Sequence, residues 1–484
     1  MKKYFLSVLA IAAMHPLLAQ SAGKSSLAAE KNAALQRLDQ LGPEYANVAM
    51  QIWNWAEVGY QEEKSSALLQ EQLRKAGFTI QSGVAEIPTA FVASYGSGKP
   101  VIGILGEFDA LPGVSQAAVP ERQERAEVKA GHACGHHLFG AGSAAAVVAV
   151  KEWLQKNGKS GTIRFYGTPA EEGGGGKVYM VRAGLFDDVD AVIHWHPSSE
   201  NGASAASSLA NMSGKIRFYG TASHAAAAPE RGRSALDAVE ALNYMVNMMR
   251  EHVQEDSRIH YVITRGGEAP NVVPAFAEVY YYARHPKMQE VKDIFARILK
   301  AAEGAAMGTG TRMEYEMVNG VYNLMPNEVL GKLMFQNLST VGGYTYSGEE
   351  KMFAEKIAQT LNRPDVLLTS TTTIQPFEVR EEGNGGSTDV GDISWVVPTA
   401  GMGAATWVPG TSAHSWQAVA AGGTSIGAKG MLVAAKTMAL TAMDLFNDPA
   451  ACAAAKAELE RRRGANFSYE PLIGARKPPL DYRK

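Results

Sequence analysis

The chain has 484 residues, more than one simple domain usually holds, which predicts two or three domains. Hydrophobic residues make up 46% of it and charged residues 20%, as in ordinary globular proteins, which excludes a disordered or fibrous chain. A net charge of −3 at pH 7 provides no electrostatic basis for binding nucleic acid or an anionic membrane surface.

The first 22 residues have the pattern of a secretory signal peptide. Two lysines precede an apolar stretch at 4–13, small residues follow Pro16, and cleavage is expected near Ala19–Ala22. A buried first helix is the alternative. The apolar stretch is too short to span a bilayer, and no cysteine directly follows it, so we expect no membrane anchor. The pattern predicts a periplasmic or secreted protein.

Helices and short strands alternate over residues 30–211, as in an α/β fold. The unbroken apolar run at 101–105 is typical of a strand buried in a parallel sheet. Such strands end at a common edge, where open α/β sheets place their functional sites. We expect helices at 30–41, 46–58, 64–76, 138–155 and 177–183, and strands at 78–80, 90–94, 101–105, 162–166 and 190–196.

From residue 212 the pattern changes to strand–helix–strand–strand–helix–strand, the order of a ferredoxin-like unit. Because this unit is complete in itself, we interpret residues 212–323 as an inserted domain. The first domain then comprises 25–211 and 324–468, around a mixed or parallel sheet. In its second part we expect helices at 327–340 and 425–446, a sheet-edge strand at 393–397, a decorating segment at 341–386, and an extended arm at 469–484.

Potential metal ligands gather in the first domain. Five of the eleven histidines fall between 132 and 196, beside Cys134, one of only two cysteines. Thiolate, imidazole and carboxylate groups gathered in this way suit a divalent transition metal. Cys134 and His136 precede a helix, Glu172 and His196 lie at the ends of expected parallel strands, and His414 lies far downstream. The fold would bring these residues together.

These motifs resemble those of the M20 metallopeptidase/amidohydrolase family, in the branch that uses cysteine as a metal ligand. The matching stretches are 131–136, 165–173, 186–197 and 387–398, in the family's order, and the resemblance extends over essentially the whole chain after the signal peptide. It implies a dinuclear metallohydrolase domain with an inserted dimerisation or lid domain. Two divalent ions, zinc or manganese with cobalt or nickel as further options, would be held by Cys134, His136, Glu172, His196 and His414.

The resemblance also implies roles for residues around the metals. Glu171 would be the general base, and His224 would reach into a partner's active site to stabilise the tetrahedral oxyanion. Asp109 would orient a metal ligand, with His194 as a further neighbour of the ligands. The residues matched to binding of polar or carboxylate groups of the substrate are Asn271 and Arg284.

Plainer alternatives stand beside these roles. Glu171 and its neighbour could be a solvated loop pair, Asp109 a turn or helix-cap residue, and His224 a helix cap. Glu107 stands where other branches of the family have a metal-binding histidine. The resemblance implies that this departure goes with Cys134 bridging the two ions, a role that an aspartate has in the other branches. Two further acidic residues, Asp389 and Asp392, are expected to make loop hydrogen bonds.

We therefore predict a metal-dependent amidohydrolase that cleaves N-acyl or aryl-acyl amino acids, with p-aminobenzoyl-glutamate as the preferred substrate. Other acyl amino acids or dipeptides are alternative substrates. A different class of function is a non-catalytic or partner-dependent subunit that holds such ligands. The inserted domain is expected to form a homodimer, or a heterodimer with a homologous subunit.

Overall fold

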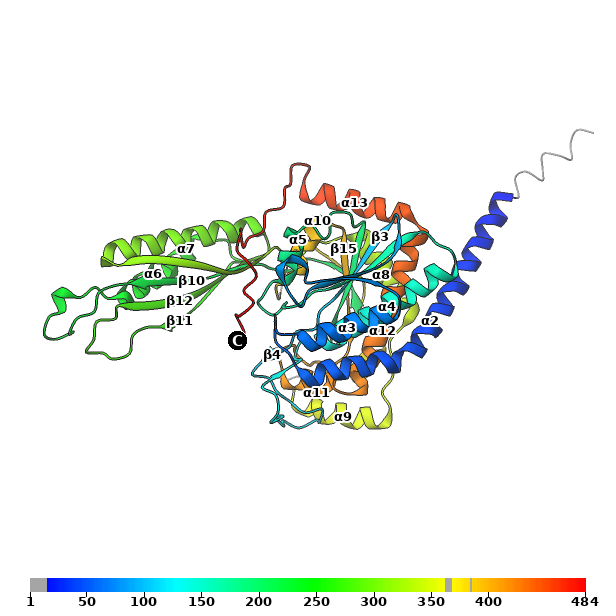
Figure 1. Ribbon diagram of the computed structural model, residues 1–484, viewed down its shortest axis with the longest axis horizontal. Coiled ribbons are helices and arrows are strands. Elements are labelled where there is room, and N and C mark those ends of the chain that lie inside the picture. Colours follow the sequence, from blue (N-terminus) through cyan, green and yellow to red (C-terminus); the bar gives the residue numbers. More distant parts are fainter. Residues whose placement is uncertain (1–14, 362–367, 384) are drawn as a thin grey trace, which may run out of the picture.

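The computed structural model describes residues 15–361, 368–383 and 385–484. The larger body carries an elongated second unit on one side and the projecting end of a long helix on the other (Figure 1). Most of the expected signal peptide, residues 1–14, lies outside the described residues. In the described part no single helix is long and apolar enough to cross a membrane, and one bent pair passes that test by length and composition only.

A seven-stranded mixed sheet forms the centre of the larger body, in the order β1-β2-β6-β3-β7-β15-β8. The four strands β6, β3, β7 and β15 are parallel, whereas β1, β2 and β8 pair antiparallel. The carboxyl ends of the parallel strands therefore meet at one edge, as expected. The bounds are β1 Thr79–Ser82, β2 Phe91–Ser97, β3 Val101–Gly106, β6 Gly161–Gly167, β7 Ala191–Ser198, β8 Gly202–Ala203 and β15 Thr399–Ala405.

The helix α4 (His136–Lys156) packs on β3, β6 and β7 and on two further helices, α2 and α12. Its small side chains let it approach the sheet closely: a Cβ on Gly140 would lie 2.7 Å from the Glu107 carbonyl oxygen. This contact brings the start of α4 beside the end of β3. The other helices of the body are α2 His15–Trp55, α3 Glu63–Lys75, α5 Gly176–Arg182, α8 Glu328–Val341, α9 Gly348–Gln359, α10 Val390–Val396, α11 Trp416–Gly422, α12 Ser425–Asn447 and α13 Pro449–Arg463.

Short strand pairs decorate the body. Strand β4 (Leu111–Pro112) pairs antiparallel with β5 (Ala130–Gly131), and β9 (Ala205–Ala206) pairs parallel with β14 (Val379–Arg380). The second pair attaches the segment before the matched stretch 387–398 to the chain that leaves β8. It thereby places residues 375–380 beside the end of β7.

The second unit is a four-stranded antiparallel sheet in the order β11-β12-β10-β13, with two helices and a hydrophobic core of its own. Its element order is the ferredoxin-like one that was predicted, while the exact domain boundaries remain a prediction. The bounds are β10 Ala210–Tyr219, α6 Ala235–Met249, β11 Arg258–Arg265, β12 Phe276–His285, α7 Met288–Thr309 and β13 Arg312–Val321.

Two local expectations are wrong. The two helices expected on either side of Gly42 are one helix, α2, which continues through Pro43. The strand expected at 393–397 lies largely in helix α10, and the strand follows at β15. Asp392, inside this helix, accepts a hydrogen bond from the backbone N–H of Tyr322 at 3.0 Å, a tertiary contact that the β-branched sequence does not reveal.

Candidate metal centre

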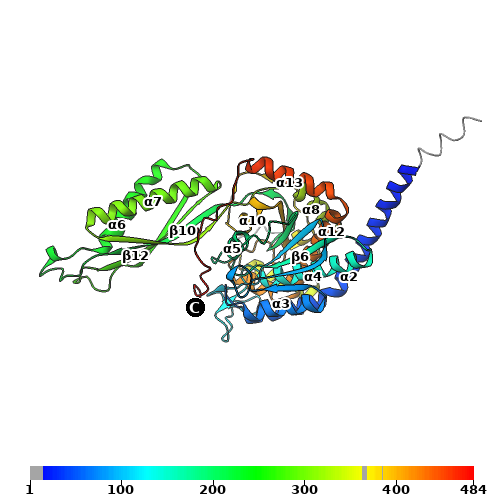
Figure 2. The same ribbon diagram turned by 45° about the horizontal axis from the view of Figure 1, so that its top comes forward.

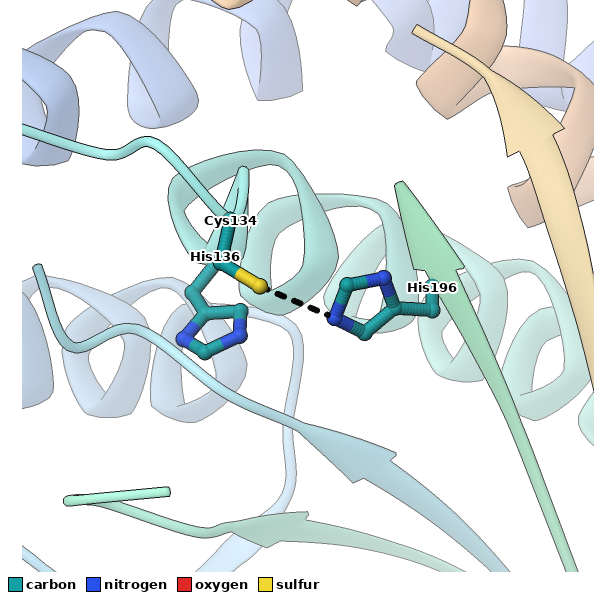
Figure 3. Close-up of side chains that lie close together, drawn as sticks. All are labelled: Cys134, His136 and His196. Atoms are coloured by element: carbon teal, nitrogen blue, oxygen red, sulfur yellow. Dashed lines mark hydrogen bonds between the residues drawn. The ribbon is translucent and has the colours of Figure 1, made fainter. Parts of the chain in front are cut away.

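Cys134, His136 and His196 converge where α4 begins beside the end of β7 (Figure 3). Sγ of Cys134 lies 3.4 Å from Nε2 of His196. One donor atom from each of the three residues lies within 4.8 Å of the others. Cys134 and His136 come from the loop and first turn of α4, whereas His196 comes from the far end of a parallel strand. The structure thus brings together potential ligands that lie far apart in the sequence.

Glu172 and His414 complete the cluster of potential metal ligands. Nε2 of His414 lies 3.1 Å from Oε1 of Glu172, and the backbone N–H of His414 donates to the Ala133 carbonyl at 3.0 Å. Two more sets of three donors lie within 4.8 Å of one another and overlap the first. These sets are Cys134, Glu172 and His414, and His136, Glu171 and Glu172.

Buried polar atoms around this cluster fit a metal ion. Among the described residues, His194 Nε2 has no hydrogen-bond partner, while His136 Nε2 lies 3.0 Å from Glu107 Oε2 and Glu172 Oε1 lies beside His414 only. These donor atoms are buried with few partners, which costs free energy that a cation among them would offset. Sulfur, imidazole nitrogen and carboxylate oxygen are the donors that zinc and related ions bind. The residues present therefore fit the group that the family resemblance implies.

Asp109 joins two segments of the cluster. Its Oδ1 lies 2.8 Å from Nδ1 of His136, and its Oδ2 accepts the backbone N–H of Glu172 at 2.9 Å. Burial would raise the pKa of Asp109, but the charge and hydrogen bond of His136 hold it below the usual range. Burial would lower the pKa of His136, but the charges of Glu107 and Asp109 raise it well above the usual range. Asp109 accepts a hydrogen bond from the proton on Nδ1, so a metal ion would take the place of the proton on Nε2.

A buried lysine network lies behind the cluster, and sequence reasoning missed it. Nζ of Lys177 lies 2.7 Å from Oε1 of Glu107 and 2.7 Å from Oδ1 of Asp389, and all three side chains are buried. Asp389 also accepts the backbone N–H of Lys177, which agrees with its expected role in loop hydrogen bonding. The only signal in the sequence was a lysine directly after four glycines.

Glu171 lies beside the cluster with an uncommitted carboxylate. Among the described residues none forms a hydrogen bond with this carboxylate. Desolvation, followed by the charges of Glu107, Glu172 and Asp389, raises its pKa well above the usual range. A carboxylate that is poorly solvated and unbonded is suited to accept a proton.

The remaining histidines near the cluster do not join the donor sets. His194 projects to the same face of β7 as His196, and burial lowers its pKa to about 4, so the ring is neutral. His132 and His137 are buried with ring centroids 4.8 Å apart, and Nε2 of His137 lies 3.0 Å from the Gly422 carbonyl. Their contacts are those of structural neighbours of the cluster.

The structure separates the three residues that were assigned to the second unit. His224 and Asn271 are exposed neighbours at its far tip, where the backbone N–H of Ala225 donates to the Asn271 carbonyl at 3.0 Å. The ten residues of β10 span roughly 30 Å from the body to this tip. Arg284 lies at the opposite end of the sheet, near the body, and its Nε has no partner among the described residues.

A cavity of about 510 Å³ opens beside His194 and His196. The segment that precedes and includes β14 forms its outer wall. Charged side chains in its lining are Glu200, Glu378 and Arg380. This volume suits a small-molecule ligand, and the mixed charges suit a polar one.

Comparison with known proteins settles the family. The family model described as peptidase family M20/M25/M40 matches residues 103–418. The chain belongs to this family. It is therefore a hydrolase that acts on amide bonds.

Similar proteins span nearly the whole chain. The B subunit of p-aminobenzoyl-glutamate hydrolase from Escherichia coli (strain K12) is 43% identical over 429 residues, which cover 84% of this chain and 89% of that protein. The Xaa-Arg dipeptidase of Mus musculus is 30% identical over 436 residues, covering 87% and 90%. The crystal structure of the aminobenzoyl-glutamate utilization protein from Klebsiella pneumoniae matches with a TM-score of 0.58 at 18% identity, covering 84% and 97%, and shows the shared fold.

Proposed function

We propose that this M20 hydrolase cleaves p-aminobenzoyl-glutamate into p-aminobenzoate and glutamate. The observation that carries the proposal is the convergence of three overlapping donor sets beside the uncommitted carboxylate of Glu171. The substrate follows from the 43% identical relative, whose name states that it belongs to a hydrolase of this compound.

Two divalent ions, zinc or manganese, fit the donor sets. Cys134, His136 and Glu172 each belong to two of the sets, so two ions held there would share their surroundings. The residues that would hold the ions are Cys134, His136, Glu172, His196 and His414. Bound there, divalent ions supply Lewis acidity, which polarises a carbonyl group and makes water more acidic.

The residues of the chain then supply the proton transfers and the geometry. Glu171 takes a proton from the attacking water and passes it to the glutamate nitrogen when the amide C–N bond breaks. Asp109 holds His136 and the backbone of Glu172 in fixed relation, since one carboxylate bonds both. Lys177 keeps Glu107 charged and in place at the back of the cluster, because it lies within 2.7 Å of it.

The charges in the cavity support the choice of substrate. Arg380, which lies 3.6 Å from Glu378 in an exposed ion pair, could exchange this partner for a carboxylate of the glutamate part, since arginine binds carboxylates well. Glu200 and Glu378 line the same cavity and favour a second candidate substrate, a dipeptide that ends in arginine. The name of the relative Xaa-Arg dipeptidase supports arginine as the second residue of such a dipeptide.

The position of the tip supports an oligomer. His224 lies roughly 30 Å along β10 from the body, so it cannot reach the donor cluster of its own chain in this arrangement. We propose that His224 and Asn271 enter the site of a second chain, either a copy of this one or a homologous subunit. The 43% identical relative is named as one subunit of its enzyme, which supports the second option.

The location of the protein is also proposed. The basic and apolar pattern of residues 1–22 supports export to a periplasm or to the outside of the cell. N-terminal sequencing of the protein recovered from a cell's extracellular or periplasmic fraction tests it. Mature protein that begins near Ala19–Ala22 is expected, and an intact N-terminus in the cytoplasm would contradict it.

The test of function measures metal content and product release in one sample. Purified protein is loaded with zinc or manganese, its metal is counted by mass spectrometry, and p-aminobenzoate release is followed by chromatography. About two ions per chain with release is expected. Faster cleavage of an alanyl-arginine dipeptide would favour the second substrate. Two ions without cleavage of either would contradict the proposal and favour a ligand-binding protein or one that depends on a partner.

A further inference from the structure

The chain ends in an arm that runs between the two units of the molecule. After α13, residues 464–484 contain no helix or strand. In both views this red segment crosses from the larger body to the base of the second unit and then descends between them (Figures 1 and 2). The end of the chain lies near the edge of the sheet at which the donors gather.

The first half of the arm is bound to the second unit. Leu472 is buried in the hydrophobic core of that unit, and a Cβ on Gly320 would lie 2.6 Å from the Leu472 Cβ. The Arg476 guanidinium pairs with Glu316 at 3.1 Å and donates to the Val318 carbonyl. The arm therefore lies against β13 and does not hang free.

The arm is also bound to the larger body. Arg182, at the end of α5, donates to the carbonyls of Gly474 at 2.9 Å and Arg476 at 2.7 Å. Gln61 donates to the Leu480 carbonyl at 2.8 Å. These bonds fix the path of the backbone up to the last four residues.

The end of the arm meets the loop that carries the glutamate pair. The Tyr482 hydroxyl donates to the backbone carbonyl of Glu172 at 3.0 Å, and the Arg483 guanidinium donates to the same carbonyl at 2.9 Å. One carbonyl oxygen can accept both bonds through its two lone pairs. The Tyr482 ring packs edge-on against Tyr60, with centroids 5.6 Å apart, and the Tyr60 hydroxyl donates to the Gly174 carbonyl at 2.8 Å.

This loop needs such support. Four glycines follow Glu172, and glycine restrains the backbone least of all residues. Ala170, just before the pair, has a φ of 57°, a conformation that costs about 1 kcal/mol or more for a residue with a Cβ. Its N–H is held by Glu62 at 2.8 Å. Without outside bonds, the carboxylates of Glu171 and Glu172 would not keep one position.

We infer that Tyr482 and Arg483 are positioning residues that fix the Glu171–Glu172 segment for hydrolysis, an inference that rests on the proposed function. Asp109 holds the N–H of Glu172 from one side, and the arm holds its carbonyl from the other. The backbone of Glu172 is thus clamped, and its side chain is aimed at His414. The arm acts through this segment and does not touch the substrate.

Two substitutions test the inference with little change in packing. Tyr482→Phe keeps the ring against Tyr60 and removes the hydroxyl, and Arg483→Gln removes the cation. They are combined in the full-length protein. Lys477→Ala is the matched control, because the side chain of that exposed arm residue pairs with Glu86, at 3.5 Å, and not with the loop. Thermal unfolding confirms that each variant is folded.

Three measurements are made on each variant. Hydrogen exchange, followed by mass spectrometry on metal-free protein, reports the mobility of residues 168–177. The rate at which bound zinc is released to a chelator reports how tightly Glu172 binds the metal. Hydrolysis of p-aminobenzoyl-glutamate gives kcat and KM. We expect faster exchange in this loop alone, zinc release about tenfold faster, and kcat about tenfold lower with little change in KM.

The outcomes separate this inference from the proposed function. Exchange and zinc release equal to those of the Lys477→Ala control would overturn it, whatever the activity. Faster exchange and zinc release in a protein that cleaves no substrate would support the clamp and count against the function alone. Replacing Arg483→Gln by Arg483→Lys in the combined variant restores a cationic donor, and this should recover part of the lost kcat. A general loss of stability without a local change in exchange would also overturn the inference.

Discussion

Replacing Glu171 or Glu172 by glutamine makes the same chemical change at neighbouring positions, with different expected results. Glu172 belongs to two of the three donor sets, and its Oε1 lies 3.1 Å from His414. Glu171 belongs to one set, and no described residue bonds its carboxylate. We therefore expect Glu171→Gln to keep the metal and lose turnover, and Glu172→Gln to lose the metal first.

The magnitude follows from the role of each group. A positioned general base contributes about 10²- to 10⁴-fold to a rate, so Glu171→Gln should lower kcat by this factor. This corresponds to about 3–5 kcal/mol in the activation free energy. KM should change little, because the amide side chain has nearly the same size. Glu172→Gln removes a ligand charge and should weaken metal binding by about 100-fold or more, since even residues behind the ligands cost 10- to 100-fold.

The assay compares both variants with the wild type at equal metal loading. Ions per chain are counted after gel filtration, and p-aminobenzoate release is measured across substrate concentrations. In metal-free protein Glu171→Gln should be no less stable than the wild type, because it removes a carboxyl group whose pKa desolvation raises. Two bound ions and near-normal kcat in both variants would refute the assignment. Loss of metal from Glu171→Gln alone would show that the roles are reversed.

Three other substitutions test the surroundings of the cluster. Cys134→Asp should keep two ions but shift preference from zinc towards manganese, because a carboxylate is a harder ligand than a thiolate, and competition between the metals measures this. Lys177→Met should cost about 3–5 kcal/mol in urea unfolding, since it leaves Glu107 and Asp389 buried without their counter-ion. In metal-free protein His137 has its pKa lowered to about 3 by burial, so the folded ring stays neutral while the unfolded one is protonated below about pH 6.5. Stability is therefore lost as pH falls, by about 1.4 kcal/mol per unit, and urea titrations at pH 7 and 5 should show a smaller loss in His137→Leu.

The sequence indicated part of the donor cluster through the ends of regular elements, and the family resemblance supplied the full set of expected ligands. Glu172 and His196 lie at the ends of parallel strands, and such strands bring distant residues to one edge. Local sequence patterns gave wrong predictions of secondary structure at two places. Ile393–Val397 is rich in β-branched residues, yet it lies largely in α10, which ends at Val396, before the extended residue that precedes Pro398. Proline is expected to end a helix, yet α2 continues through Pro43.

Long-range partners of single side chains could not be predicted. Lys177 is a charged residue after a glycine run, a pattern that normally indicates a solvated loop, and only the fold shows that two buried carboxylates surround it. Tyr482 and Arg483 stand in a segment without periodicity or motif, 310 and 311 residues from Glu172, to which they donate. A hydrogen bond to a backbone carbonyl places no demand on the acceptor's side chain, so the acceptor's sequence gives no sign of it.

The glycine-rich loop explains why these hidden partners matter. A Cβ on Gly176 would lie 2.1 Å from the Pro169 carbonyl oxygen, so the loop can fold back on itself only without a side chain there. The same glycines leave the loop without stiffness of its own. Its position is fixed instead by hydrogen bonds from its backbone to the side chains of Asp109, Tyr60 and Tyr482 of the arm. The position of the Glu171 and Glu172 carboxylates thus depends on residues that follow β3, on the loop after α2 and on the last residues of the chain.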